Sequence, residues 1–168
     1  IAAAIQEGAM AYLKRQFKTI LVILIPLSVI VFLTSTEVVR TVGGREVTEL
    51  SFGQSGAFRT LAFLAGCAMS GLTGFIGMGL AVRGNVRTAA AAKSGSMKAA
   101  LKVAFRPGGV AGMFCVGLGL LGATTIIMIF QNTSSAILIG FGFGGSLLAL
   151  FLRVGGGIFT KAADGGAD

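Results

Sequence analysis

Four long apolar stretches divide this chain, and polar or charged residues separate them. The stretches cover about residues 19–33, 60–82, 108–130 and 135–152. The hydrocarbon core of a bilayer is about 30 Å thick and accepts about 20 apolar residues as a helix, which satisfies its own backbone hydrogen bonds. The pattern therefore predicts an all-α fold, a polytopic transmembrane bundle with four membrane helices in a single unit over 1–168.

The composition excludes an ordinary water-soluble domain. Hydrophobic residues make up 54% of the chain and charged residues only 12%, against about a quarter charged in soluble proteins. The mean hydropathy is +0.88. A soluble core could not cover so many apolar runs, so the chain requires lipid around it. The chain begins without Met and ends inside a polar helical pattern, so we expect a piece of a longer protein.

The net charge of +8 indicates orientation in the membrane. The basic residues flank apolar runs and have almost no aromatic residues between them, so no nucleic-acid partner is expected. The connection 83–106 carries six basic residues and no acidic one, which predicts a cytoplasmic position. The cluster 14–18 and the helical extension 153–168 then also lie in the cytoplasm, and the mixed segment 36–58 is an external, solvated loop. In a bacterium the membrane would be the inner, or plasma, membrane.

Glycine is frequent, with 27 of 168 residues, and many glycines recur at short spacing. Gly71, Gly74 and Gly77 form one such series, and Gly117 to Gly122 contain another. In lipid, small residues allow helix backbones to approach closely, so a tightly packed bundle is expected. The pattern G-x-G-x-x-G at 140–145 lies inside an apolar stretch without a preceding strand, so we reject a nucleotide-binding loop there.

The polar residues after the fourth stretch share one face of a predicted helix. At 100° per residue they fall within an arc of about 80°. Carboxylates four residues apart suit Mg²⁺, and a lysine one turn earlier suits a phosphate. The alternative is a surface helix end with an i, i+3 ion pair contributing about 0.2–0.5 kcal/mol, and spacing alone leaves both open. The residues of this polar arc are Arg153, Gly157, Lys161, Asp164 and Asp168.

Arg153 lies against an apolar run, where a cation is costly and normally faces a bundle interior, a counter-ion or a water path. The alternative is that its long side chain extends to the cytoplasmic headgroups. The three glycines 155–157 weaken this alternative, because glycine costs helix propensity unless another backbone or a substrate approaches closely. Both interpretations of Arg153 remain open at this point.

Residues 153–168 read Arg-Val-Gly-Gly-Gly-Ile-Phe-Thr-Lys-Ala-Ala-Asp-Gly-Gly-Ala-Asp. This run resembles the start of the substrate-binding motif of membrane-bound, ion-translocating inorganic pyrophosphatases. The resemblance extends through 7–13, 74–78, 85–89 and 104–106, in the family's order and rough spacing. It covers the chain except for the loop 36–58.

The resemblance implies a homodimer of about sixteen membrane helices per subunit, of which this chain is the N-terminal part. Such a protein hydrolyses pyrophosphate with magnesium on the cytoplasmic side and exports protons or sodium. Lys161 would bind pyrophosphate, Asp164 and Asp168 would hold Mg²⁺, and Arg153 would belong to the ion pathway. The residues that activate water would lie beyond Asp168, so no catalytic residue is assigned in this chain, and we expect the fragment alone to be inactive.

Two non-enzymatic alternatives stay open. In one, the chain is part of a secondary transporter or channel in which Arg153 lines an ion path and residues 161–168 form a cytoplasmic gate. In the other, it is a membrane scaffold without a site. A pyrophosphatase should add further lysine and carboxylate residues after Asp168, whereas a transporter need not.

Overall fold

The computed structural model of this protein describes residues 2–42 and 45–167. Long helices account for most of the chain, which confirms the all-α class, and one short hairpin interrupts them. The elements in order are α1 (Ala2–Leu33), β1 (Val38–Val42), β2 (Arg45–Leu50), α2 (Phe52–Lys93), α3 (Met97–Phe130), a short 3₁₀ turn η1 (Gln131–Thr133) and α4 (Ser134–Ala167).

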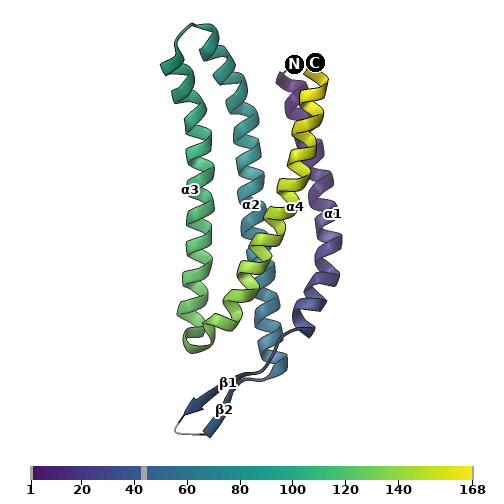
Figure 1. Cartoon of the computed structure of the whole chain (residues 1–168), viewed down its shortest axis with the longest axis vertical. Helices are drawn as coiled ribbons and strands as arrows, with labels where there is room; N and C mark the ends of the chain where they lie inside the picture. The colour runs from purple at the N-terminus through teal and green to yellow at the C-terminus, as the bar shows by residue number, and fades with distance from the viewer. Residues whose placement is uncertain (1, 43–44, 168) are drawn as a thin grey trace.

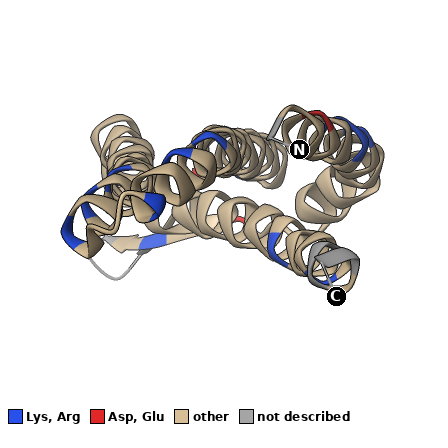
Figure 2. Ribbon diagram, turned by 90° about the horizontal axis from the view of Figure 1, so that it is seen from above, with Lys and Arg blue, Asp and Glu red and all other residues tan. Residues whose placement is uncertain are grey.

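The helices run alternately up and down beside one another (Figure 1). Both chain ends and the α2–α3 turn lie at one end of the molecule, and the β-hairpin and the α3–α4 turn lie at the other. We call these the basic end and the hairpin end. Arg40, Arg45 and Arg59 belong to the hairpin end, and the other eleven of the fourteen basic residues lie toward the basic end. Figure 2 looks onto the basic end and shows these residues distributed over the helices.

Three continuous stretches of the described residues are long and apolar enough to cross a membrane. They are Ala3–Leu33, Phe52–Lys93 and Met97–Ala162. The third contains both α3 and α4, because η1 adds no charged residue between them. This count differs from the four expected membrane helices, although α3 and α4 are separate helices of 34 residues each.

The expectation of a plain loop over 36–58 was wrong. β1 and β2 form an antiparallel hairpin in which Arg40 pairs with Val47 and Thr41 with Glu46. The β-branched residues of this segment favour strands, and the exposed Arg40–Glu49 ion pair joins the two strands at 3.3 Å. Helix α2 then begins at Phe52, where Gln54 Oε1 accepts a hydrogen bond from Ser51 N at 3.3 Å.

The connection 83–106 is mostly helical. α2 continues to Lys93, α3 begins at Met97, and only three residues form the turn. Gly95 takes a positive φ of 78°, which glycine adopts without strain, and Ser96 Oγ caps α3 by accepting from Ala99 N at 3.3 Å. The six basic residues of this connection are therefore exposed along two antiparallel helix ends, rather than on a loop.

The backbones of α2 and α4 approach each other closely. A Cβ on Gly66 would overlap the carbonyl oxygen of Phe141, and one on Gly144 would overlap that of Phe63. Phe63 is fully buried there, and Cys67 Sγ donates to Gly144 O at 3.3 Å. Gly140 and Gly144 thus serve helix packing, which agrees with rejecting a nucleotide-binding loop.

Candidate functional site

The C-terminal third of α4 has a packed face that points toward α1 and α2. A Cβ on Gly74 of α2 would come within 2.6 Å of Leu152 Cδ1. On α1, the Tyr12 ring lies 5.3 Å from the Phe159 ring, centroid to centroid. Both neighbouring helices therefore hold this part of α4 by close side-chain contact.

Gly155 is central to the contact with α1. A Cβ at this position would overlap the Tyr12 hydroxyl and would lie 2.8 Å from Gln16 Nε2. Gln16 Nε2 donates a hydrogen bond to the Phe151 carbonyl oxygen at 3.1 Å, one turn earlier on α4. Residues 151, 155 and 159 are spaced by four, so they form one helical face against α1. Of the three successive glycines, Gly155 is the one that this contact requires, since Gly156 and Gly157 have no such neighbour within 4 Å among the described residues.

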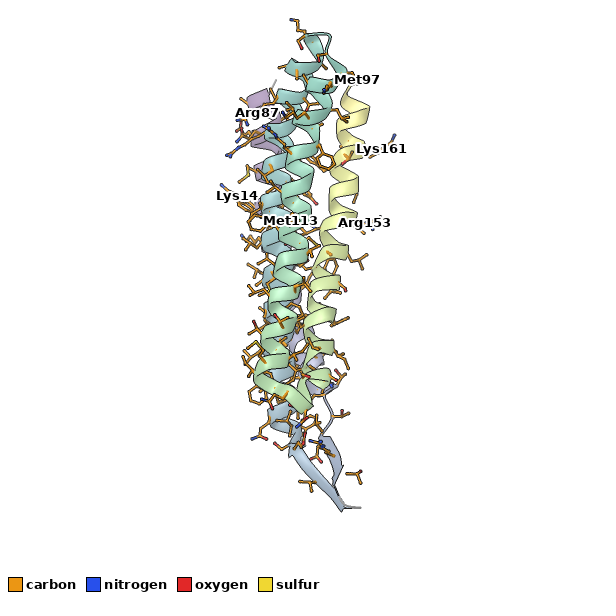
Figure 3. The ribbon with its side chains drawn as sticks, turned by 90° about the vertical axis from the view of Figure 1, so that its left-hand side faces the viewer. Lys14, Arg87, Met97, Met113, Arg153 and Lys161 are labelled. Carbon is orange, nitrogen blue, oxygen red and sulfur yellow. The ribbon has the colours of Figure 1, made fainter. Side chains whose placement is uncertain are left out.

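The polar arc occupies the opposite side of α4. Gly155 is rotated by about 200° from Arg153 at 100° per residue, so a contact through Gly155 directs Arg153 away from α1. Arg153, Gly157 and Lys161 are all exposed. Figure 3 shows the Arg153 and Lys161 side chains projecting from the side of α4 that faces away from the other helices.

The predicted site residues are described to different extents. Arg153 and Lys161 lie eight residues apart on α4, which corresponds to about 12 Å along the axis. The backbone of Asp164 belongs to the same helix, but its side chain lies outside the described part of the structure, and Asp168 lies outside it altogether. Within the described residues, no group of three or more His, Cys, Asp or Glu residues forms a candidate metal site.

Arg153 lies at the height of the basic cluster of α1. The Gln16–Phe151 hydrogen bond links the two helices at this level, and Figure 3 shows Lys14 and Arg153 at similar heights on opposite sides of the bundle. Lys161 lies further toward the basic end. A substrate site at Lys161 and an ion pathway at Arg153 would thus occupy different heights on one helix.

Sequence reasoning missed the residues that fix the rotation of α4. Tyr12 is the single tyrosine of the chain, and it stands four residues before Gln16 on α1. Two polar side chains spaced by four on one face of a helix are a signal for a specific helix contact, and it was available in the sequence. Arg59 was also missed, and it donates to the Ala136 carbonyl oxygen at 3.1 Å near the hairpin end.

The model of the family described as inorganic H⁺ pyrophosphatase matches residues 1–168, the whole chain. The chain belongs to this family. This match confirms the resemblance recognised in the sequence. The family and the long apolar helices of this chain together identify it as part of an integral membrane protein.

Several curated relatives carry the name "K(+)-insensitive pyrophosphate-energized proton pump". The one from Chloroflexus aurantiacus is 49% identical over 170 residues, which covers 98% of this chain and 21% of the relative. The one from Streptomyces coelicolor is 45% identical over 181 residues, which covers 100% of this chain and 21% of the relative. The one from Methanosarcina mazei is 44% identical over 168 residues, which covers 100% of this chain and 22% of the relative.

The chain thus spans about a fifth of the length of the curated H⁺ pyrophosphatase relatives that it matches. No solved structure matches the chain.

Proposed function

We propose that this chain is part of an ion pump that couples cytoplasmic hydrolysis of magnesium pyrophosphate to translocation of protons or sodium. The family match and the names of the relatives, which are proton pumps energised by pyrophosphate, support this function. A secondary transporter or channel, or a scaffold without a site, is not favoured, because neither explains a match to a pyrophosphatase family over the whole chain.

The observation that carries the assignment of roles is the opposition of the two faces of α4. Its packed face is fixed by Tyr12, Gln16 and Gly155, so the polar arc is free to meet substrate or other helices of the complete pump. In this proposal Lys161 binds pyrophosphate as a point charge, and Arg153, which lies further from the basic end on α4, belongs to the ion pathway. The remainder of the pump supplies the residues that activate water.

Magnesium fits the kind of ligands on this arc. Mg²⁺ prefers oxygen ligands and usually takes one or two carboxylates together with water and substrate phosphates. Asp164 and Asp168 are the two carboxylates that would hold it, which is enough for such a site even though the described residues contain no larger acidic group. When bound, the ion would neutralise charge on the diphosphate and polarise its oxygens.

The proposed arrangement in the membrane is multi-pass, with the basic end in the cytoplasm. The supporting observation is that the excess of basic residues lies at one end, while the hairpin end carries three basic residues and Glu37, Glu46 and Glu49. The segments proposed to span lipid are 19–33, 60–82, 108–130 and 135–152, with 153–168 extending into the cytoplasm. The complete pump is proposed to be a homodimer, surrounded by membrane lipid.

The roles can be tested in the full-length pump with single substitutions on α4. Asp164→Asn should lower the apparent magnesium affinity at least about tenfold, because a charged oxygen ligand is lost. Lys161→Ala should chiefly raise KM for pyrophosphate, because this charge attracts the phosphate in both ground and transition states. Arg153→Ala should reduce the ions transported per pyrophosphate hydrolysed in sealed vesicles, with Arg153→Lys intermediate.

Ile158→Ala is a matched control, because Ile158 is exposed on α4 between Arg153 and Lys161 but lies off the polar arc. It should leave all three measurements unchanged. Wild-type magnesium dependence in Asp164→Asn would reject the metal role, and an unchanged transport ratio in Arg153→Ala would remove Arg153 from the ion pathway.

A further inference from the structure

An apolar groove opens between α1 and α2, on the opposite side of the bundle from the polar arc. It has a volume of about 730 Å³, within the range of about 300–1,000 Å³ that is typical of small-molecule sites. Leu148 of α4 lies at its floor, and aliphatic and aromatic side chains form its walls. The walls include Phe17 and Leu24 of α1, and Leu64, Leu72 and Phe75 of α2.

Two lysines line the same groove. Lys14 and Lys18 are one helical turn apart on α1, and both are exposed. Like charges at this spacing repel each other, and an anion between them removes this cost. No acidic residue is among the residues that line the groove. The groove therefore combines a pair of cations with a long apolar surface.

The position of the lysines along α1 adds a second constraint. Lys18 is the last charged residue before the apolar stretch that begins at Thr19 and continues to Leu33. If this stretch lies in the hydrocarbon, Lys14 and Lys18 lie at the level of the lipid phosphates, and the groove lined by Ile20 and Leu24 runs down beside the acyl chains. Figure 3 shows Lys14 projecting outward from the bundle at this level.

We propose that this groove binds an anionic phospholipid, with its phosphate between Lys14 and Lys18 and an acyl chain against Phe17, Leu64 and Phe75. One such molecule supplies both the negative charge and the apolar chain that the groove fits. Basic pockets between membrane helices on the cytoplasmic side bind anionic headgroups in this way. The proposal does not depend on pyrophosphate hydrolysis, because lipid binding is measured without substrate.

Native mass spectrometry of the full-length pump in mild detergent tests the site, with phosphatidylglycerol and phosphatidylcholine as probes. Wild-type protein should retain phosphatidylglycerol in preference to phosphatidylcholine. Each lysine should contribute about fivefold to this preference, from about 1 kcal/mol per basic residue near the surface, so Lys14→Gln/Lys18→Gln should abolish most of it. Ala68 is exposed in the groove, and Ala68→Phe should weaken binding of both lipids by filling the apolar channel.

One double variant serves as a matched control. Lys98→Gln/Lys102→Gln removes two exposed charges one turn apart on α3. It should retain phosphatidylglycerol as the wild type does.

A phosphatidylglycerol with a photoreactive group in its acyl chain provides the second readout. It should cross-link within 64–75 of α2. The proposal is overturned if Lys14→Gln/Lys18→Gln binds phosphatidylglycerol as the wild type does. It is likewise overturned if the α3 double variant loses as much phosphatidylglycerol as the α1 double variant, because general surface charge would then explain the binding. It is also overturned if no cross-link falls within 64–75, as when another helix of the pump covers the groove.

Discussion

α2 and α3 are both long, apolar and rich in glycine, but their glycines have different surroundings. On α2, Gly66, Gly71 and Gly74 each face a neighbour so close that a Cβ would meet it at 3.0 Å or less. On α3, Gly112, Gly117 and Gly119 have no such neighbour within 4 Å among the described residues, although Gly122 meets the Phe141 ring. The outer side of α3 is instead open, with Met113 75% and Met128 77% exposed.

This difference separates two uses of the same residue. In the α2–α4 contact, the missing side chains allow two backbones to touch, and dispersion between them replaces the hydrophobic driving force that lipid does not supply. On α3, Gly112, Gly117 and Gly119 make no such contact with the described residues. A recurring glycine pattern therefore predicts the capacity for close packing, and the partner helix decides whether it is used.

The largest effect is expected at Gly144. A methyl group there would overlap the Phe63 carbonyl oxygen, and because a backbone atom cannot rotate aside, α2 and α4 would have to separate. Gly144→Ala should lower the free energy of unfolding of the full-length protein by about 1–3 kcal/mol or more. Gly142→Ala, two residues away and with no described atom within 4 Å of its Cβ, should instead stabilise α4 by about 0.5–1 kcal/mol. Thermal unfolding in detergent measures both, and equal midpoints would show that the contact is not needed.

An intermediate effect is expected at the α1–α4 contact. Gly155→Ala should destabilise the full-length protein and disturb the orientation of Arg153, while the matched Gly156→Ala should not, because a Cβ at Gly156 would have no described neighbour within 4 Å. Tyr12→Phe removes the hydroxyl that the new methyl group would overlap. The double variant Tyr12→Phe/Gly155→Ala should therefore recover part of the lost stability and transport ratio, giving a measurable interaction energy in a double-mutant cycle. Strictly additive effects would contradict the contact.

The smallest effect is expected on α3. Gly117→Leu adds a side chain where the described residues leave open space, so the free energy of unfolding should change little, by about 0.5 kcal/mol or less. The same substitution at Gly66, against Phe141 O, is the contrasting variant. A large loss of stability in Gly117→Leu would mean that another helix of the full-length protein packs against α3, and the contrast between α2 and α3 would then be a property of this chain alone.

Apolar length predicted the helical class, because in lipid a continuous apolar run has few other ways to satisfy its backbone. The hairpin 38–50 was missed, since it depends on β-branched residues within a segment whose charges resemble a loop. Its strand signal was local and weak. The helical extent of 83–106 was also underestimated, because alanine-rich polar helix and solvated connection differ little in hydropathy.

The residues of the candidate site could be named from sequence, since a long motif carries the resemblance to H⁺ pyrophosphatases. Their direction could not. Helical spacing places Arg153 and Lys161 on one arc, but only the contact of Gly155 with Tyr12 and Gln16 shows which way that arc points. A contact between segments more than 130 residues apart, such as Gln16 with Phe151, leaves no periodic trace in a single sequence.

The length of α2 has a mechanical consequence. Its 42 residues span about 63 Å at 1.5 Å per residue, about twice the thickness of the hydrocarbon core. Backbone hydrogen bonds fix this rise, so the helix cannot shorten, and a displacement at its hairpin-side end must appear at its basic end as a shift, tilt or rotation. Because α4 rests on α2 backbone to backbone, α4 must follow that displacement. A rigid helix of this length couples motion at the hairpin end to motion at the basic end through a single continuous element.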